Sequence, residues 1–193
     1  MDKRDLEQLL SDVADGSITP ADALTRIQTA PTADLGFAQL DLSRGVRQGA
    51  GEVVYGAGKT AEQIAAIIEA LRDAGQGRIL VTRLDAEKAA RTSELLGNGI
   101  DLGYVPDAQL ALVGGKPSPT GNGRVVVACA GTSDLPVAEE AALTAEFYGN
   151  EVDRLYDVGV AGLHRLLAHA EELAQAQVII AVAGMEGALA SVI

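Results

Sequence analysis

The sequence predicts an α/β protein: an N-terminal helical hairpin and a small α/β domain, followed by a doubly wound parallel sheet. Three observations predict this fold. From residue 124 onward, strand and helix patterns alternate along the chain. The first of these strands, Val125–Ala130, is a continuous apolar run, as expected for a strand buried on both faces. A Gly- and Pro-rich segment at 114–123 separates this part from the preceding one.

The N-terminal segment, residues 1–33, predicts two short helices. Thr19, Pro20 and Asp22 are typical of the start of the second helix. The break at 30–34 then interrupts the pattern and marks the first domain boundary. The apolar residues of the first helix recur at helical spacing: Leu6, Leu9, Leu10 and Val13.

Residues 34–115 predict a small α/β domain in the order β-β-α-β-α, with further strand material after it. Thr60 begins a helix that stops at Gly75, and Asp85 begins a second helix that ends at Gly97. The expected strands are 37–42, 52–55, 78–83 and 110–113.

Residues 124–193 predict the parallel sheet domain, with right-handed crossovers between its strands. Three strands make a narrow sheet, and the pattern stops inside the first turns of a helix, so we expect a domain truncated at its C-terminus. The expected strands are 125–130, 151–157 and 178–183, and the expected helices are 136–148, 160–173 and one from Gly187.

Composition excludes several functions. Lys and Arg total 15 against 27 Asp and Glu, and the net charge of −12 argues against general nucleic-acid binding. The single cysteine excludes an intramolecular disulfide and a multi-cysteine metal site, which suits the cytoplasm. No signal peptide or membrane span is expected.

The loops that follow the three parallel strands are the candidate site, because ligands bind outside the carboxyl ends of such strands. They are 131–134, 158–165 and 183–187, and each is Gly-rich and opens a helix. None carries a dinucleotide-binding or P-loop glycine pattern.

Each candidate side chain in these loops has a structural alternative. Ser133 and Asp134 are candidates for catalysis or for helix capping. His164 is a candidate site residue or a surface histidine, and Glu186 is a candidate site residue or an ordinary first-turn acid. Cys129 lies in an apolar run, which favours burial over reactivity.

Basic residues among glycines in the small domain indicate phosphate capture, with salt bridges as the alternative. These residues are Arg44, Arg47 and Lys59.

The same loops resemble those of the LarB family, the pyridinium-3,5-biscarboxylic acid mononucleotide synthases of nickel-pincer cofactor assembly. The resemblance rests on 131–142, 156–165 and 182–192, and on upstream residues between Asp41 and Thr60. It implies a flavodoxin-like C-terminal domain similar to the carboxylase PurE. It also implies carboxylation of nicotinic acid adenine dinucleotide at pyridinium C5, with hydrolysis of the phosphoanhydride to release AMP.

The resemblance also implies roles for individual residues. Ser133, Asp134, His164 and Glu186 would serve catalysis. Substrate binding would fall to Gly131, Thr132, Asp157, Gly162, Arg165, Gly184, Met185, Gly187, Arg44, Arg47 and Lys59. No metal site or tightly bound cofactor is expected. Carbon dioxide or bicarbonate would be the co-substrate, with Mg²⁺ as an optional addition.

The family also uses a covalent cysteine thiolate, which the resemblance assigns to a segment beyond Ile193 and not to Cys129. Two other functions stay open. One is an aminoimidazole ribonucleotide carboxylase-like enzyme of purine synthesis, and the other is a non-catalytic nucleotide-binding fragment. We expect a homo-oligomer, because a narrow sheet with Ala- and Gly-rich helices leaves apolar surface exposed.

Overall fold

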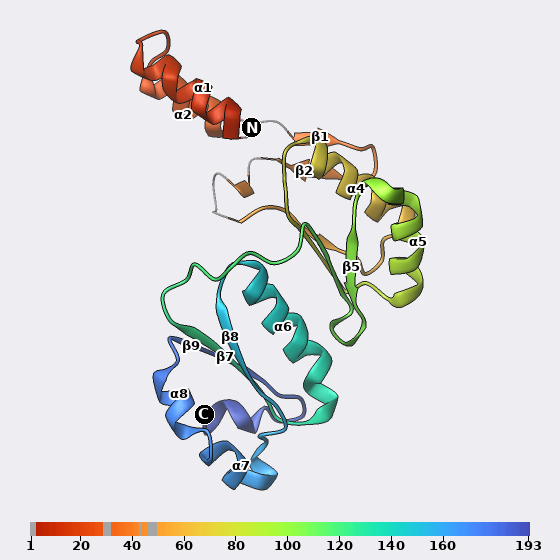
Figure 1. The fold of residues 1–193 in the computed structure, drawn as a ribbon, viewed down its shortest axis with the longest axis vertical. Coiled ribbons are helices and arrows are strands. Elements are labelled where there is room, and N and C mark those ends of the chain that lie inside the picture. Colours follow the sequence, from red (N-terminus) through yellow and green to blue (C-terminus); the bar gives the residue numbers. More distant parts are fainter. Residues whose placement is uncertain (1–2, 29–31, 43, 46–49) are drawn as a thin grey trace. The chain divides into compact units, whose positions relative to one another are not determined.

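The computed structural model describes residues 3–28, 32–42, 44–45 and 50–193 (Figure 1). The chain divides into two compact units. The first is Met1–Gly103 with Ala111–Gly114, and the second is Tyr104–Leu110 with Gly115–Ile193. The finer division at 1–33, 34–115 and 124–193 stays a prediction.

The predicted N-terminal helical hairpin is present. Helix α1 spans Lys3–Ala14 and α2 spans Pro20–Gln28, and the two helices pack against each other. The Thr19 hydroxyl accepts a hydrogen bond from the Asp22 N–H at 3.1 Å, as the sequence predicted for a helix start.

A two-stranded antiparallel sheet follows the hairpin. Strand β1, Thr32–Asp34, pairs with β2, Gln39–Asp41. Strand β1 lies within the segment 30–34, where the sequence predicted an interruption of the helical pattern but no strand. The strand has three residues and is mostly exposed, so it has no apolar pattern, and the turn to its partner contains Gly36, which adopts a φ of +77°.

A mixed sheet follows, with its strands in the order β3-β4-β6-β5. The strands are β3 Val53–Tyr55, β4 Ile79–Thr82, β5 Leu102–Val105 and β6 Leu110–Val113. Strands β3 and β4 are parallel, and β4 and β6 are antiparallel. The sequence analysis missed β5, where Gly103 interrupts an already short apolar pattern.

The two predicted helices of this unit have the expected N-caps. Helix α4, Ala61–Asp73, begins with a capping box between Thr60 and Gln63. Helix α5, Ala86–Leu96, begins with the Asp85 carboxylate accepting the Lys88 N–H at 2.8 Å. The two helices pack against each other, and α4 buries an apolar face that includes Ile64, Ile68 and Leu71.

The second unit is a parallel sheet in the order β8-β7-β9. Strand β7, Arg124–Cys129, lies in the centre, with β8, Glu151–Leu155, and β9, Val178–Val182, parallel to it on either side. Helix α6, Leu135–Phe147, covers one face (Figure 1). Helices α7, Leu163–Leu167, and α8, Ala170–Gln175, lie on the other face. The predicted doubly wound α/β fold is confirmed.

Alternate residues of β7 supply the two cores of this unit. Val127 and Cys129 pack with Ala138 of α6 on one face. Val126 and Ala128 pack on the other face, with Leu155, Val158, Leu166 and Leu189. Burial on both faces explains why the strand reads as an uninterrupted apolar run.

The single helix predicted at 160–173 is wrong. A 3₁₀ turn at Val160–Gly162, α7 and α8 occupy this range, and the His169 N–H donates to the Leu166 carbonyl at 3.0 Å where α7 ends. The apolar residues of this range are only partly used by the core: Leu166 is 2% exposed but Leu167 is 62% exposed. Leu166 of α7 and Leu173 of α8 pack in the same core, and two short helices place both without a continuous helix.

The helix predicted from Gly187 is a short 3₁₀ helix, Ala188–Ser191, and not an α-helix. Leu189 is the residue of this helix that reaches the core. A single 3₁₀ turn is enough to bury one side chain, so this segment does not need a longer α-helix.

A network of charged and polar side chains joins α6 to β8. Arg154 pairs with Glu139 at 3.3 Å and with Glu146 at 2.6 Å, and the Tyr156 hydroxyl donates to Glu139 at 2.7 Å. Burial, followed by the hydrogen bond to Glu139, raises the pKa of Tyr156. The network fixes the position of α6, the helix that follows the first candidate loop.

No helix in the described part of the chain is long and apolar enough to cross a membrane.

Candidate active site

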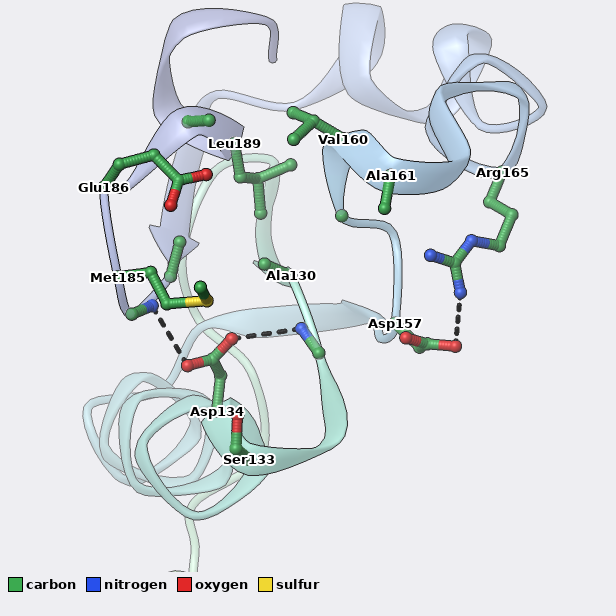
Figure 2. A pocket seen from close by; sticks show the side chains of 15 residues that line it. Ala130, Ser133, Asp134, Asp157, Val160, Ala161, Arg165, Met185, Glu186 and Leu189 are labelled. Atoms are coloured by element: carbon green, nitrogen blue, oxygen red, sulfur yellow. Dashed lines mark hydrogen bonds and ion pairs between the residues drawn. The ribbon is translucent and has the colours of Figure 1, made fainter.

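A pocket lies where strands β7, β8 and β9 end, between the three loops that follow them (Figure 2). Its volume of about 320 Å³ falls in the range of about 300–1,000 Å³ that is usual for small-molecule sites. The lining residues are Ala130, Gly131, Ser133, Asp134, Asp157, Gly159, Val160, Ala161, Arg165, Ala183, Gly184, Met185, Glu186, Ala188 and Leu189.

Asp134 connects the first loop to the third. Its Oδ2 atom accepts a hydrogen bond from the Gly131 N–H at 3.0 Å, and its Oδ1 atom accepts one from the Gly184 N–H at 3.1 Å (Figure 2). Each carboxylate oxygen has a second lone pair, which leaves it able to accept a further hydrogen bond or a proton. Asp134 therefore shapes the pocket and also presents an acceptor at its floor.

Arg165 is the basic residue of the lining, and the Asp157 carboxylate holds it in an ion pair (Figure 2). The guanidinium also lies close over Gly162, where an added Cβ would come within 2.7 Å of Nε. Asp157 has a φ of +57°, an uncommon conformation for a residue with a side chain and one that clusters at functional sites. With Asp134, Asp157 and Glu186 against Arg165, the lining carries excess negative charge.

The second loop lies unusually close to the end of β7. The Gly159 N–H donates to the Ala130 carbonyl at 2.9 Å, and a Cβ on Gly159 would meet that oxygen at 2.6 Å. Only glycine permits this approach, so Gly159 allows the second loop to lie against the end of β7.

The third loop is a tight turn in which the Gly187 N–H donates to the Gly184 carbonyl at 3.0 Å. Met185 and Glu186 occupy the middle of this turn, and both are exposed. Met185 has a φ of +55°. Figure 2 shows its side chain lying between those of Glu186 and Asp134.

Comparison with known proteins identifies a known domain in the part of the chain that precedes the pocket residues. Residues 32–114 match the LarB/PurE-like N-terminal domain. The chain therefore contains a LarB/PurE-like N-terminal domain. Its similarity to an uncharacterized protein of Methanocaldococcus jannaschii extends beyond that domain, with 39% identity over 160 residues. The match covers 80% of this chain and 62% of the relative, so the chain spans less than two thirds of the relative's length.

The structure brings together many, but not all, of the residues that the LarB resemblance singled out. The pocket lining includes Gly131, Ser133, Asp134, Asp157, Arg165, Gly184, Met185 and Glu186. Thr132, Gly162, His164 and Gly187 belong to the same loops but stand outside the lining. His164 is exposed on α7.

The predicted phosphate-binding residues of the first unit make local contacts. Arg44 lies 3.5 Å from the Glu52 carboxylate, and the Lys59 ammonium donates to the Tyr55 carbonyl at 3.0 Å. Arg47 lies outside the described residues. These contacts match the salt-bridge alternative for Arg44, and the phosphate role of all three residues stays a prediction.

Sequence reasoning assigned no role to the apolar part of the lining. Ala130, Val160, Ala161, Ala183, Ala188 and Leu189 surround the polar groups. Their signal was their position next to the candidate residues at the ends of the apolar strands. Within the described residues, no group of three or more His, Cys, Asp or Glu side chains is placed to hold a metal ion.

Cys129 is buried, as predicted. Its thiol donates to the Gly131 carbonyl at 3.6 Å, and it is not among the lining residues. Burial is the largest of the effects that raise the pKa of the Cys129 thiol, and the nearby Asp134 carboxylate adds to it. The thiol therefore has neither the access nor the ionisation of a nucleophile.

Cys129 is expected to react with a disulfide reagent such as DTNB only after the protein unfolds. Absorbance of the released thiolate, followed with and without guanidinium chloride, measures this protection. The Cys129→Ala variant is the blank, because the sequence contains no other cysteine. Labelling of the folded protein as fast as of the unfolded protein would contradict the buried assignment.

Proposed function

We propose that this chain belongs to an enzyme that carboxylates nicotinic acid adenine dinucleotide. The reaction adds a carboxylate at C5 of the pyridinium ring and cleaves the phosphoanhydride to release AMP. Its product is the pyridinium-3,5-biscarboxylic acid mononucleotide of nickel-pincer cofactor synthesis. The observation that carries the proposal is the pocket in which all three LarB-like loops meet.

The domain match supports the reaction class. The match to a LarB/PurE-like domain supports a carboxylase-family function, with carbon dioxide or bicarbonate as the co-substrate. The particular substrate is the part that we propose.

The charges of the pocket support a ligand with a cationic ring. The lining contains three carboxylates and one guanidinium, so the electrostatic potential at the centre of the pocket favours a positive group. A pyridinium ring supplies that positive charge. Arg165, held by Asp157, is suited to an anionic substituent at the edge of the site, such as the carboxylate or a phosphate.

The proton chemistry falls to the acidic side chains. Carboxylation replaces the hydrogen at C5, and a base must accept that proton before the ring regains its aromaticity. Asp134 and Glu186 both line the pocket and are the candidates. Ser133 contributes a hydroxyl at the start of α6, which we assign to binding.

The ring itself requires a nucleophile from elsewhere. A pyridinium ring is electron-poor and does not attack carbon dioxide until a thiolate adds to it and converts it into an enamine. Cys129 does not meet this requirement, because it is buried and lies outside the pocket lining. We therefore do not assign the thiol to Cys129.

Product analysis tests the proposal. Protein that contains this chain together with a thiol of the kind that the family uses is incubated with nicotinic acid adenine dinucleotide and ¹³C-bicarbonate, and the mixture is analysed by mass spectrometry. We expect AMP and a labelled mononucleotide carboxylate. The 193-residue chain alone should bind the dinucleotide without forming a covalent adduct, which intact-mass measurement checks.

Two other outcomes would replace the proposal. Carboxylation of aminoimidazole ribonucleotide in place of the dinucleotide would assign the protein to purine synthesis, which the PurE-like part of the family match keeps as the second candidate. Binding of the dinucleotide without AMP or carboxylated product would indicate a nucleotide-binding module.

We further propose that the protein acts in the cytoplasm as a homo-oligomer, without nucleic-acid or membrane partners. The exposed apolar side chains on β9 and α7, including Val178, Ile179 and Leu167, support the oligomer.

A further inference from the structure

Met185 combines two unfavourable features at the pocket. Its apolar side chain is fully exposed, and its backbone has a φ of +55°. A residue with a side chain is strained in this region, and glycine would occupy the same turn without strain. Neither burial nor turn geometry accounts for a methionine at this position.

Hydrogen bonds of the surrounding turn fix the backbone at Met185. The preceding residue, Gly184, donates its N–H to Asp134 at 3.1 Å, and its carbonyl accepts the Gly187 N–H at 3.0 Å. The turn is therefore closed on both sides of Met185. Figure 2 shows the thioether extending along the pocket beside the Asp134 carboxylate.

The rest of the lining offers little for a flat ring to lie against. It contains no aromatic side chain, and its apolar members other than Met185 are alanines, Val160 and the buried Leu189. A thioether is polarisable and makes favourable contacts with aromatic rings. Carboxylates on both sides of it, from Asp134 and Glu186, favour a ring that carries positive charge.

We propose that Met185 is a specificity-determining residue whose thioether packs on the cationic aromatic ring of the ligand. The inference rests on the proposed function and adds to it how the ring is distinguished from the remainder of the dinucleotide. The strained turn presents the side chain, and the two carboxylates orient the ring beneath it.

Calorimetric titration of the 193-residue chain tests the inference with two ligands. Nicotinic acid adenine dinucleotide has the pyridinium ring, and ADP-ribose lacks it but keeps both phosphates and the adenosine. Wild-type protein is expected to bind the dinucleotide more tightly than ADP-ribose. Met185→Gly should lower affinity for the dinucleotide by about fivefold and leave affinity for ADP-ribose unchanged.

Met185→Ala is the matched control for the backbone. Alanine removes the thioether but keeps a Cβ in the strained turn, whereas glycine removes both. If the side chain binds the ring, the two variants lose affinity equally. If only Met185→Gly loses affinity, rigidity of the turn is responsible and the inference is wrong.

Thermal unfolding and sedimentation complete the test. The melting temperature of Met185→Gly should equal or exceed that of wild type, because glycine relieves the strain. A change in sedimentation coefficient with ring affinity intact would place Met185 in a contact between copies and overturn the inference.

If wild-type protein binds neither ligand, the proposed function fails. If both variants bind the dinucleotide as wild type does, only the inference fails.

Discussion

Asp134→Ala is expected to lower turnover by about 100-fold or more and to reduce the free energy of unfolding by about 2 kcal/mol. The variant removes the acceptor for the Gly131 and Gly184 N–H groups, which leaves the first and third loops unconnected. It also removes a candidate proton acceptor from the pocket. Chemical denaturation measures the stability, and AMP release per folded molecule measures the turnover.

Asp134→Asn separates the two roles. Asparagine keeps one carbonyl oxygen and the shape of the side chain, so it can preserve one of the two loop contacts, but it does not accept a proton. This variant should lower turnover, because its side chain does not ionise. It should also reduce the free energy of unfolding, but by less than alanine does, because only one of the two loop contacts is lost.

Asp153→Ala is the matched control for both Asp134 variants. Asp153 is a carboxylate of the same unit, but it lies on β8, pairs with Arg124 of β7 and is not part of the pocket. Its loss should leave turnover unchanged. Loss of turnover no greater than the loss of folded protein in Asp134→Asn would restrict Asp134 to a structural role.

Arg165→Ala is expected to weaken binding of nicotinic acid adenine dinucleotide by about 10- to 100-fold. The pocket would lose its basic residue and keep three carboxylates, which repel the anionic groups of the ligand. Because Asp157 fixes the guanidinium and Gly162 lies beneath it, Arg165→Lys should recover only part of the affinity. Titration calorimetry at two salt concentrations measures the change.

Arg124→Ala controls for the loss of one positive charge. Arg124 pairs with Glu151 and Asp153 at the start of β7, whereas the pocket lies at the other end of the strand. Its variant should bind the dinucleotide as wild type does. Equal weakening by both variants would show that net charge, and not the position of Arg165, governs binding.

The elements predicted correctly are those that local sequence specifies. The capping box of Thr60 and Gln63 involves residues three apart, so spacing alone identifies the start of α4. The apolar run of β7 reveals burial on both faces without reference to any partner strand. The glycines of the three loops likewise marked the ends of the parallel strands, and the pocket lies there.

The elements missed or misread depend on contacts that spacing does not encode. Strand β1 is defined by its pairing with β2, and β5 contains a glycine that conceals its pattern. The range 160–173 has helical periodicity throughout, yet the sheet contacts Leu166 and leaves Leu167 exposed. Periodicity reports which side chains are able to share a face, whereas packing decides how much of that face is used.

The sequence by itself determined the alternation of strands and helices, the Gly-rich loops and the acidic balance of the chain. Only the tertiary structure decided which loop residues meet. Asp134 reaches the Gly184 N–H because β7 and β9 pair in a register that sets Cys129 beside Val182. His164 belongs to an equally promising motif, but the turn before α7 leaves it outside the lining. Hydrogen bonds between residues fifty positions apart follow from strand register, which local spacing does not specify.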